Sequence, residues 1–407
     1  MILWNAIDSF PGNHTDAELA IHRPCPVCGY GRSTEVLCMP DFQFFSDSAE
    51  EPKRVDIRQV QCQQCRALYL ESAYTVKGFQ ILFAEAGCSY GATEGRAGEQ
   101  LDWLDSHRLL EKNQSLLDVG CYEGRFLSMM PDGMQRIGVD IDGPAIERGR
   151  KSLDSRGVIL IQGDFNQVKL PATPDTITMF HVLEHLPDPL ATLTNLRCQA
   201  SERTRLVVEV PILEKGFTND INGFFSAQHM THFSRQSLSN LLARAGWVID
   251  EMFEQPDYNG CRVLAKAGVP TAALKSDSED DSTLERLLAH WHNAAAGVNQ
   301  RLNSLNGTEK ILIWGGGMHT EFLYHYTDLF KDKTRRFVIV DSDPLKQGKS
   351  WRGITILAPK NLKEWKKETF SMVISSYAGQ RSIFRSALAL GLAENRIVVL
   401  YDNFYLY

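Results

Sequence analysis

The sequence has no apolar run of about 18 residues, the length that a membrane-spanning helix needs. Its first residues lack a positively charged start followed by an apolar block, so we expect no secretory signal. Positive charge is also in deficit, because 43 Lys and Arg stand against 50 Asp and Glu, a net charge of -7. That balance argues against a nucleic-acid-binding surface. We therefore expect a cytoplasmic protein with neither nucleic acid nor membrane as a partner.

Cysteine, by contrast, is present nine times. Without a secretory signal, thiols are expected to be reduced and available to a metal. Two C-x-x-C pairs stand out, Cys25 with Cys28 and Cys62 with Cys65. Each pair can offer two thiolates to one tetrahedral ion, and four protein ligands leave no open position for catalysis. We predict a structural zinc ion. Free or redox-active thiols are the alternative, although a redox site needs only one such pair.

The chain is organised around the stretch 116–124, LLDVGCYEG. It predicts a buried strand, a glycine turn and a helix from Arg125. Gly120 and Gly124 remove side chains where the backbone approaches a ligand. The helix would direct its positive end at whatever lies over the turn.

Three further signals follow in order. Asp140 ends a short apolar strand, where a carboxylate in a βαβ unit accepts ribose hydroxyls. Next comes the run Gly163-Asp164-Phe165, in which the Asp can accept from an adenine amino group and the Phe can cover the ring. A fourth strand, 176–180, leads into His181 and the run HVLEHLPDP.

This ordered set resembles the class I S-adenosylmethionine-dependent methyltransferases, over roughly residues 116–266. A dinucleotide-binding domain is the alternative, but the turn lacks the G-x-G-x-x-G phosphate fingerprint. The chain departs from the family at Tyr122, where a second glycine is usual. The resemblance implies that the cofactor contacts these residues: Tyr90, Asp118, Gly120, Gly124, Asp140, Ile141, Asp164, Phe165 and His181. For Tyr90, a loop tyrosine without a role is an equal alternative.

Later segments complete an α/β chain. Glu209 lies near the end of the strand 206–211, where it can bind substrate hydroxyls or remain a solvated strand-end charge. Residues 271–283 are polar and acidic and indicate a linker. A second βαβ series begins at Lys310, with its own glycine turn and a downstream acid, Asp341. We predict a zinc-binding domain at 1–72, a methyltransferase domain with a doubly wound sheet at 73–270, and a linker helix with a Rossmann-like domain at 271–407.

This order of domains resembles the zinc-containing sugar C-methyltransferases that act on nucleotide-linked keto-deoxysugars. The C-terminal run 341–349, DSDPLKQGK, matches the family's pattern, and His229 falls on the family's proposed base. Two departures are Gln228, where a glutamate is usual, and Ser226, where a tyrosine is usual. The resemblance implies S-adenosylmethionine as cofactor and a nucleotide-sugar as substrate, contacted by Glu209, Gln228 and His232. We expect a monomer or a weak homodimer.

Carbon methylation beside a ketone needs a base for the α-proton, and a neutral imidazole suits that task near pH 7. We therefore predict that His229 is the general base of a C-methyltransferase. A structural hydrogen-bonding role for this ring is the alternative. Methylation of a hydroxyl or amine on a glycan or another small molecule is the second functional hypothesis. A non-catalytic scaffold that binds S-adenosylmethionine is the third.

Overall fold

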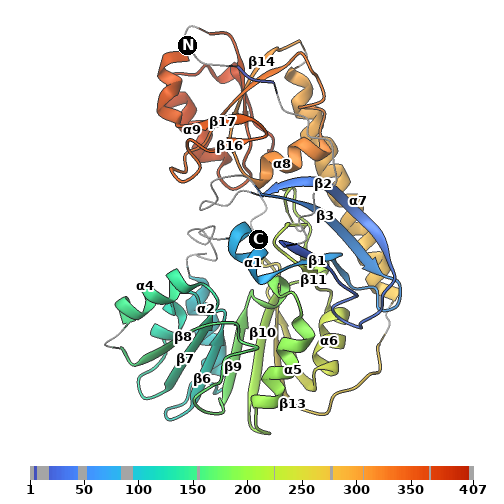
Figure 1. Cartoon of the computed structure of the whole chain (residues 1–407), viewed down its shortest axis with the longest axis vertical. Helices are drawn as coiled ribbons and strands as arrows, with labels where there is room; N and C mark the ends of the chain where they lie inside the picture. The colour runs from blue at the N-terminus through green and yellow to red at the C-terminus, as the bar shows by residue number, and fades with distance from the viewer. Residues whose placement is uncertain are drawn as a thin grey trace.

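The computed structural model describes residues 4–6, 18–44, 53–83, 95–153, 156–223, 225–275, 278–305, 307–365 and 368–402. It is an elongated molecule with two α/β bodies at opposite ends and a β-rich part between them (Figure 1). Among the described helices, none is both long and apolar enough to cross a bilayer.

The N-terminal part contains a four-stranded sheet with the order β11-β4-β3-β2, whose strands come from two distant parts of the sequence. Three of its strands come from the start of the chain: β2 (Ser33–Phe44), β3 (Lys53–Cys62) and β4 (Leu68–Leu70). The fourth, β11 (Thr231–His232), arrives from far along the sequence and pairs antiparallel with β4. A small two-stranded sheet, β1 (Ala20–His22) with β5 (Ser72–Tyr74), and helix α1 (Val76–Phe83) lie beside it.

The central body is a seven-stranded sheet with the order β12-β13-β10-β9-β6-β7-β8. Five strands run parallel: β6 (Ser115–Val119), β7 (Gln135–Asp140), β8 (Val158–Gln162), β9 (Thr176–Phe180) and β10 (Arg205–Pro211). The other two, β12 (Trp247–Glu254) and β13 (Gly260–Ala267), form an antiparallel hairpin. Because β13 is inserted between β10 and β12 and runs against β10, the order differs from the all-parallel arrangement of dinucleotide-binding domains.

Helices α2 (Arg96–Ser106), α3 (Arg125–Ser128), α4 (Gly143–Leu153), α5 (Pro189–Gln199) and α6 (Arg235–Arg244) accompany this sheet. Helix α6 begins directly after Ser234, as its sequence indicates, because Ser234 and Ser237 form a capping box. The helix expected from Arg125 is only four residues long. Pro131 disfavours a helical conformation at the residue before it, which explains the early end.

The C-terminal body has a six-stranded sheet with the order β16-β17-β15-β14-β18-β19. Its strands are β14 (Lys310–Trp314), β15 (Arg336–Val340), β16 (Ser350–Trp351), β17 (Ile354–Leu357), β18 (Ser371–Ile374) and β19 (Ile397–Val398), with helices α8 (Met318–Tyr326) and α9 (Gln380–Ala389). Helix α7 (Ser278–Leu302) runs along one side of the molecule, next to β2 and β3 (Figure 1). The expected linker at 271–283 is therefore too long, since residues from Ser278 onward already belong to this helix.

The N-terminal part packs against both bodies. One buried apolar cluster joins Cys25, Val27 and Tyr69 to the central sheet. Another joins β2, through Phe42 and Phe44, to α7 and the C-terminal body. The four-cysteine region is therefore part of the scaffold that holds the two α/β bodies together.

Candidate active site

The glycine turn after β6 has the backbone shape that the sequence predicts. Gly120, Tyr122 and Gly124 have φ angles of 78°, 51° and 74°. These lie in the left-handed region, which glycine adopts freely and other residues adopt at a cost of roughly 1–2 kcal/mol. Tyr122 thus takes the conformation that a second glycine usually provides. A Cβ on Gly120 would lie 2.2 Å from Val182 Cγ2, so any other residue there would force Val182 to shift.

Asp140 closes this turn from the end of β7. Its Oδ2 accepts a hydrogen bond from the backbone N–H of Tyr122 at 2.7 Å, and its Oδ1 accepts from that of Asp142 at 2.8 Å. Each carboxylate oxygen keeps a second lone pair, so both remain able to accept from a ribose hydroxyl. Burial raises the pKa of Asp140, and the backbone N–H groups of Asp142, Tyr122 and Ile141 oppose that shift. Ile141, next along the chain, is half-buried at the same edge.

Asp118 lies deeper than the turn. It is buried within β6, and its Oδ1 accepts from the hydroxyl of Thr178 on β9 at 2.7 Å. Burial raises its pKa to about 7. Beyond β8, Asp164 is half-buried and accepts from the backbone N–H of Asn166 at 2.9 Å. Phe165 is buried in the same apolar cluster as the central sheet. Tyr90 lies outside the described residues.

Glu209 is the centre of a buried ionic network at the end of β10. Its Oε2 lies 2.6 Å from Nε of Arg262 on the neighbouring strand β13. Its Oε1 accepts from Arg96 at 2.9 Å, from Gln100 at 3.0 Å and from the hydroxyl of Tyr258 at 3.0 Å. Burial alone would raise the pKa of Glu209, but His181, Arg262 and Arg96 lower it to about 2.

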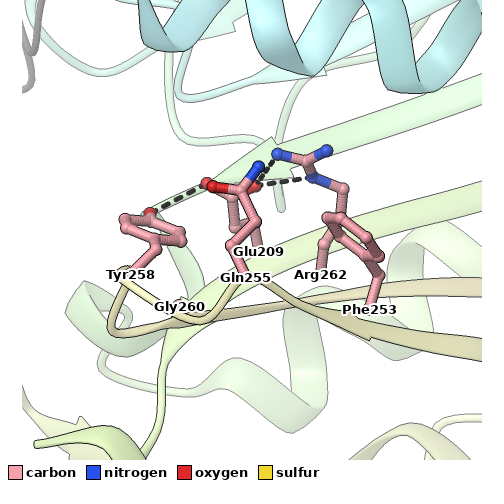
Figure 2. Close-up of a pocket in the computed structure, with 6 residues that line it drawn as sticks. All are labelled: Glu209, Phe253, Gln255, Tyr258, Gly260 and Arg262. Carbon is pink, nitrogen blue, oxygen red and sulfur yellow. Dashed lines mark hydrogen bonds and ion pairs between the residues drawn. The ribbon is translucent and has the colours of Figure 1, made fainter.

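Figure 2 shows Tyr258 and Arg262 on either side of the Glu209 carboxylate, in a small pocket that Phe253, Gln255 and Gly260 complete. The side chain of Glu209 is 1% exposed. An acceptor molecule could therefore reach this carboxylate only after protein donors release it.

His181 connects this network to a second group of polar side chains. Its Nε2 contacts Arg96 and Tyr258 and lies 3.3 Å from Glu209 Oε1. Its Nδ1 lies 3.2 Å from Glu184 Oε1. Burial lowers the pKa of His181, but the two carboxylates outweigh burial and raise it. His181 also has a φ of 55°, a strained backbone conformation of the kind that clusters at functional sites.

The predicted base, His229, belongs to a second group of side chains, which includes Glu184 and His185. The ring of His229 lies against that of His185, with centroids 4.9 Å apart, and His185 Nε2 lies 3.9 Å from Glu184 Oε1. His229 is half-buried, and burial, together with the neighbouring His185, holds its pKa well below the usual value. This environment favours the neutral form of the His229 imidazole.

Two other predicted residues lie around this ring. Gln228 is half-buried, and its backbone carbonyl faces His185 Nδ1 at 3.0 Å. His232 is on β11, 1% exposed, with its ring centroid 5.7 Å from that of His229. Burial lowers the pKa of His232 to about 3. The structure thus brings His181, Gln228, His229 and His232 into one group of contacts that Glu209 joins through His181.

The four predicted zinc ligands form one compact group, with sulfur atoms that all lie within 4.8 Å of one another. The Sγ atoms of Cys25 and Cys65 are 3.5 Å apart, as are those of Cys28 and Cys62. A tetrahedral ion with bonds of about 2.3 Å to sulfur needs sulfur–sulfur edges of about 3.8 Å. The arrangement fits such an ion.

Sequence reasoning missed several members of the site. Arg96 and Gln100 come from α2, Tyr258 from the turn before β13, and Arg262 from β13, whose register places it opposite Glu209. Nothing in their local sequence marks them, because each depends on a pairing across the sheet. Glu184 was within reach, since it lies between His181 and His185 in a motif that the sequence did reveal.

Two segments of the chain match models of known protein families. Residues 96–252 match the family model described as a methyltransferase domain. By this match, the central segment is a methyltransferase domain. Residues 307–398 match a second model, described as C2185-like, N-terminal, which lies over the C-terminal body.

Individual relatives are distant. A ubiquinone biosynthesis O-methyltransferase from an Azoarcus species is 31% identical over 99 residues, which is 23% of this chain and 42% of that protein. The chain thus spans less than half of that relative's length. A methyltransferase from Clostridium acetobutylicum is 10% identical, with a TM-score of 0.38, and covers 47% of this chain and 99% of that one. Magnesium protoporphyrin IX methyltransferase from Synechocystis, with bound SAH, is 18% identical, with a TM-score of 0.35. The match covers 42% of this chain and 82% of that one.

Proposed function

We propose that this protein transfers a methyl group from S-adenosylmethionine to the carbon of a nucleotide-linked keto-deoxysugar, with His229 as the general base. The methyltransferase domain supports the cofactor. The neutral, half-buried imidazole of His229, in contact with residues of the HVLEHLPDP motif, supports the base. The resemblance of most of the chain to sugar C-methyltransferases supports the acceptor.

The residues at the turn fit this cofactor. Asp140 has two carboxylate oxygens held in place by backbone donors, and each can accept one ribose hydroxyl. Gly120 and Gly124 leave two positions of the turn without side chains. When bound, S-adenosylmethionine supplies a methyl group activated by a positively charged sulfur. Asp164 and Phe165 remain the proposed adenine contacts, and Tyr90 and Ile141 are proposed neighbours.

The protein's own task is to align the acceptor and remove its proton. His229 suits proton removal because its ring is uncharged, and an uncharged ring has a lone pair to offer. The buried Glu209 network holds α2 against β10 and β13, so it fixes one wall of the site. We propose that Gln228 and His232 shape the acceptor side, and that Glu209 contacts substrate only in an opened state.

The four cysteines are proposed to hold a structural zinc ion, as their spacing and geometry suit. We also propose that residues 1–72 act as the zinc-binding domain, 73–270 as the transferase, and 271–407 as a second Rossmann-like domain. The strand β11 then links the transferase to the zinc-binding sheet, since it carries His232 and directly follows the loop of His229.

A hydroxyl or amine acceptor is the second candidate. It is favoured by Gln228, which replaces the usual glutamate, and by the ubiquinone O-methyltransferase relative, which is named for oxygen transfer. Incubation with methyl-labelled S-adenosylmethionine and a panel of nucleotide-linked keto-sugars, followed by mass analysis and product NMR, separates the candidates. A C-methyl resonance supports the proposal. An O-methyl or N-methyl resonance supports the second candidate, and tight donor binding without turnover supports a scaffold.

A further inference from the structure

Glu184, His185 and His229 form a cluster of possible metal ligands apart from the four cysteines. One ligand atom from each side chain lies within 4.8 Å of the other two. Ligand atoms that share one ion at about 2.1 Å lie about 3–4 Å apart. Glu184 Oε1 and His185 Nε2 are 3.9 Å apart and already fall in that range. The ligand atom of His229 lies within 4.8 Å of both and would move closer on binding an ion.

The cluster holds buried polar atoms that protein partners do not satisfy. Glu184 is 1% exposed; its Oε1 is paired with His181 Nδ1 at 3.2 Å, whereas its Oε2 has no hydrogen-bond partner among the described residues. Within the same described part of the chain, His229 Nδ1 is also buried and has no hydrogen-bond partner. Buried acceptors of this kind cost about 1–3 kcal/mol each unless something binds them. A cation between them would satisfy both.

His185 is oriented in the way that metal-binding histidines are. Its Nδ1 faces the backbone carbonyl of Gln228 at 3.0 Å. A carbonyl oxygen only accepts, so the ring proton of a neutral His185 lies on Nδ1 and its lone pair on Nε2, the atom nearer Glu184. Histidine ligands commonly donate their second ring nitrogen to a carbonyl in this manner, which fixes the tautomer that binds metal.

We propose that Glu184, His185 and His229 bind a divalent transition-metal ion such as Zn²⁺ or Co²⁺. Two imidazoles and one carboxylate suit these ions rather than Mg²⁺ or Ca²⁺, which prefer oxygen ligands. The consequence for turnover rests on the proposed function. A metal bound to His229 occupies the lone pair that accepts the proton, so the ion inhibits methyl transfer.

Metal stoichiometry tests the binding independently of activity. The full chain, its cysteine site filled with one Zn²⁺, is titrated with Co²⁺ and followed by visible absorption and by metal analysis after gel filtration. The expected result is one further ion, with d–d bands but without intense sulfur-to-metal absorption. His185→Ala and the near-isosteric Glu184→Gln should each weaken this binding at least about tenfold. His22→Ala, at a largely exposed histidine, is the matched control and should bind as wild type does.

A wild-type chain that stops at the cysteine-bound ion would overturn the site, as would undiminished binding in both variants. The Glu184→Gln variant keeps the test valid if His185→Ala does not fold. Added Co²⁺ should also reduce turnover in step with occupancy of the second site. If the ion binds and turnover is unchanged, the metal site stands and the role of His229 as base fails.

Discussion

Arg262 donates its Nε–H to Glu209 Oε2 at 2.6 Å across the β10–β13 pair, and both side chains are almost wholly buried. The same guanidinium reaches Glu99 on α2 at 2.6 Å. A buried ion pair contributes little net stability, but removing one partner leaves an uncompensated charge. Arg262 binds Glu99 of α2, and Glu209 binds Arg96 of the same helix. The pair therefore acts as a clamp that fixes α2 over the end of the sheet.

Glu209→Gln should lower the free energy of unfolding of the central body by about 3 kcal/mol, because Arg96 and Arg262 lose their shared buried anion. Hydrogen exchange of the β10 amides during denaturant titration measures this loss. Glu254→Gln breaks the partly exposed pair with Arg235 and should cost at most about 1 kcal/mol. Equal losses in the two variants would contradict the clamp.

Asp140→Asn should weaken binding of S-adenosylhomocysteine at least about tenfold. Its amide NH₂ would face one of the two backbone N–H donors that the carboxylate now accepts, so the turn and the ribose acceptor are both disturbed. Calorimetry measures the affinity. Asp142→Asn is the control, because Asn caps the backbone N–H of Ala145 as well as Asp does. An unchanged affinity in Asp140→Asn would remove this residue from the cofactor site.

Cys62→Ser should abolish zinc binding and lower the melting temperature of the central body as well as of the N-terminal part. The reason is the apolar cluster that joins the cysteines to the central sheet. Metal analysis and thermal unfolding measure the two effects. Cys198→Ser, at an exposed thiol, should change neither. A variant without zinc but with an unaltered central melting transition would show that the metal does not support the transferase.

The burial of Asp118 leads us to predict how the folding stability of the protein depends on pH. Its pKa rises from 3.8 to about 7, so the folded state holds a proton that the unfolded state releases between these values. Stability should therefore fall as pH rises from about 4 to about 7, by up to about 1.4 kcal/mol per unit. Asp118→Asn does not titrate and can still accept from Thr178, so it should lack this component. Parallel pH profiles of the two proteins would mean that Asp118 does not retain its proton.

Much of the fold can be predicted from the sequence because its strands are short apolar runs bounded by glycine and polar residues. The runs at 116–119, 136–140 and 176–180 all proved to be parallel strands of one sheet. The four cysteines were also found from their spacing alone, and they converge as predicted. These features are local, and local patterns are what a sequence displays.

The remaining features depend on contacts between distant segments. No periodic pattern in the sequence predicts that Thr231 and His232, which belong to the transferase segment, pair with β4 of the N-terminal sheet. The acidic stretch from Ser278 has the composition of a linker, yet it begins a helix whose later apolar face packs in the interior. Glu209 was expected to face substrate, but donors from α2 and β13 meet it first. Each of these outcomes is decided by tertiary packing rather than by local preference.

The most direct test of the central claim compares wild type with His229→Ala in a single-turnover assay with methyl-labelled S-adenosylmethionine and a keto-sugar nucleotide. Wild type should transfer the label to carbon. The variant should be slower by at least about 100-fold, the usual contribution of a general base, while its affinity for the donor stays unchanged. Transfer at the wild-type rate by His229→Ala, with the donor bound equally well, would contradict the account.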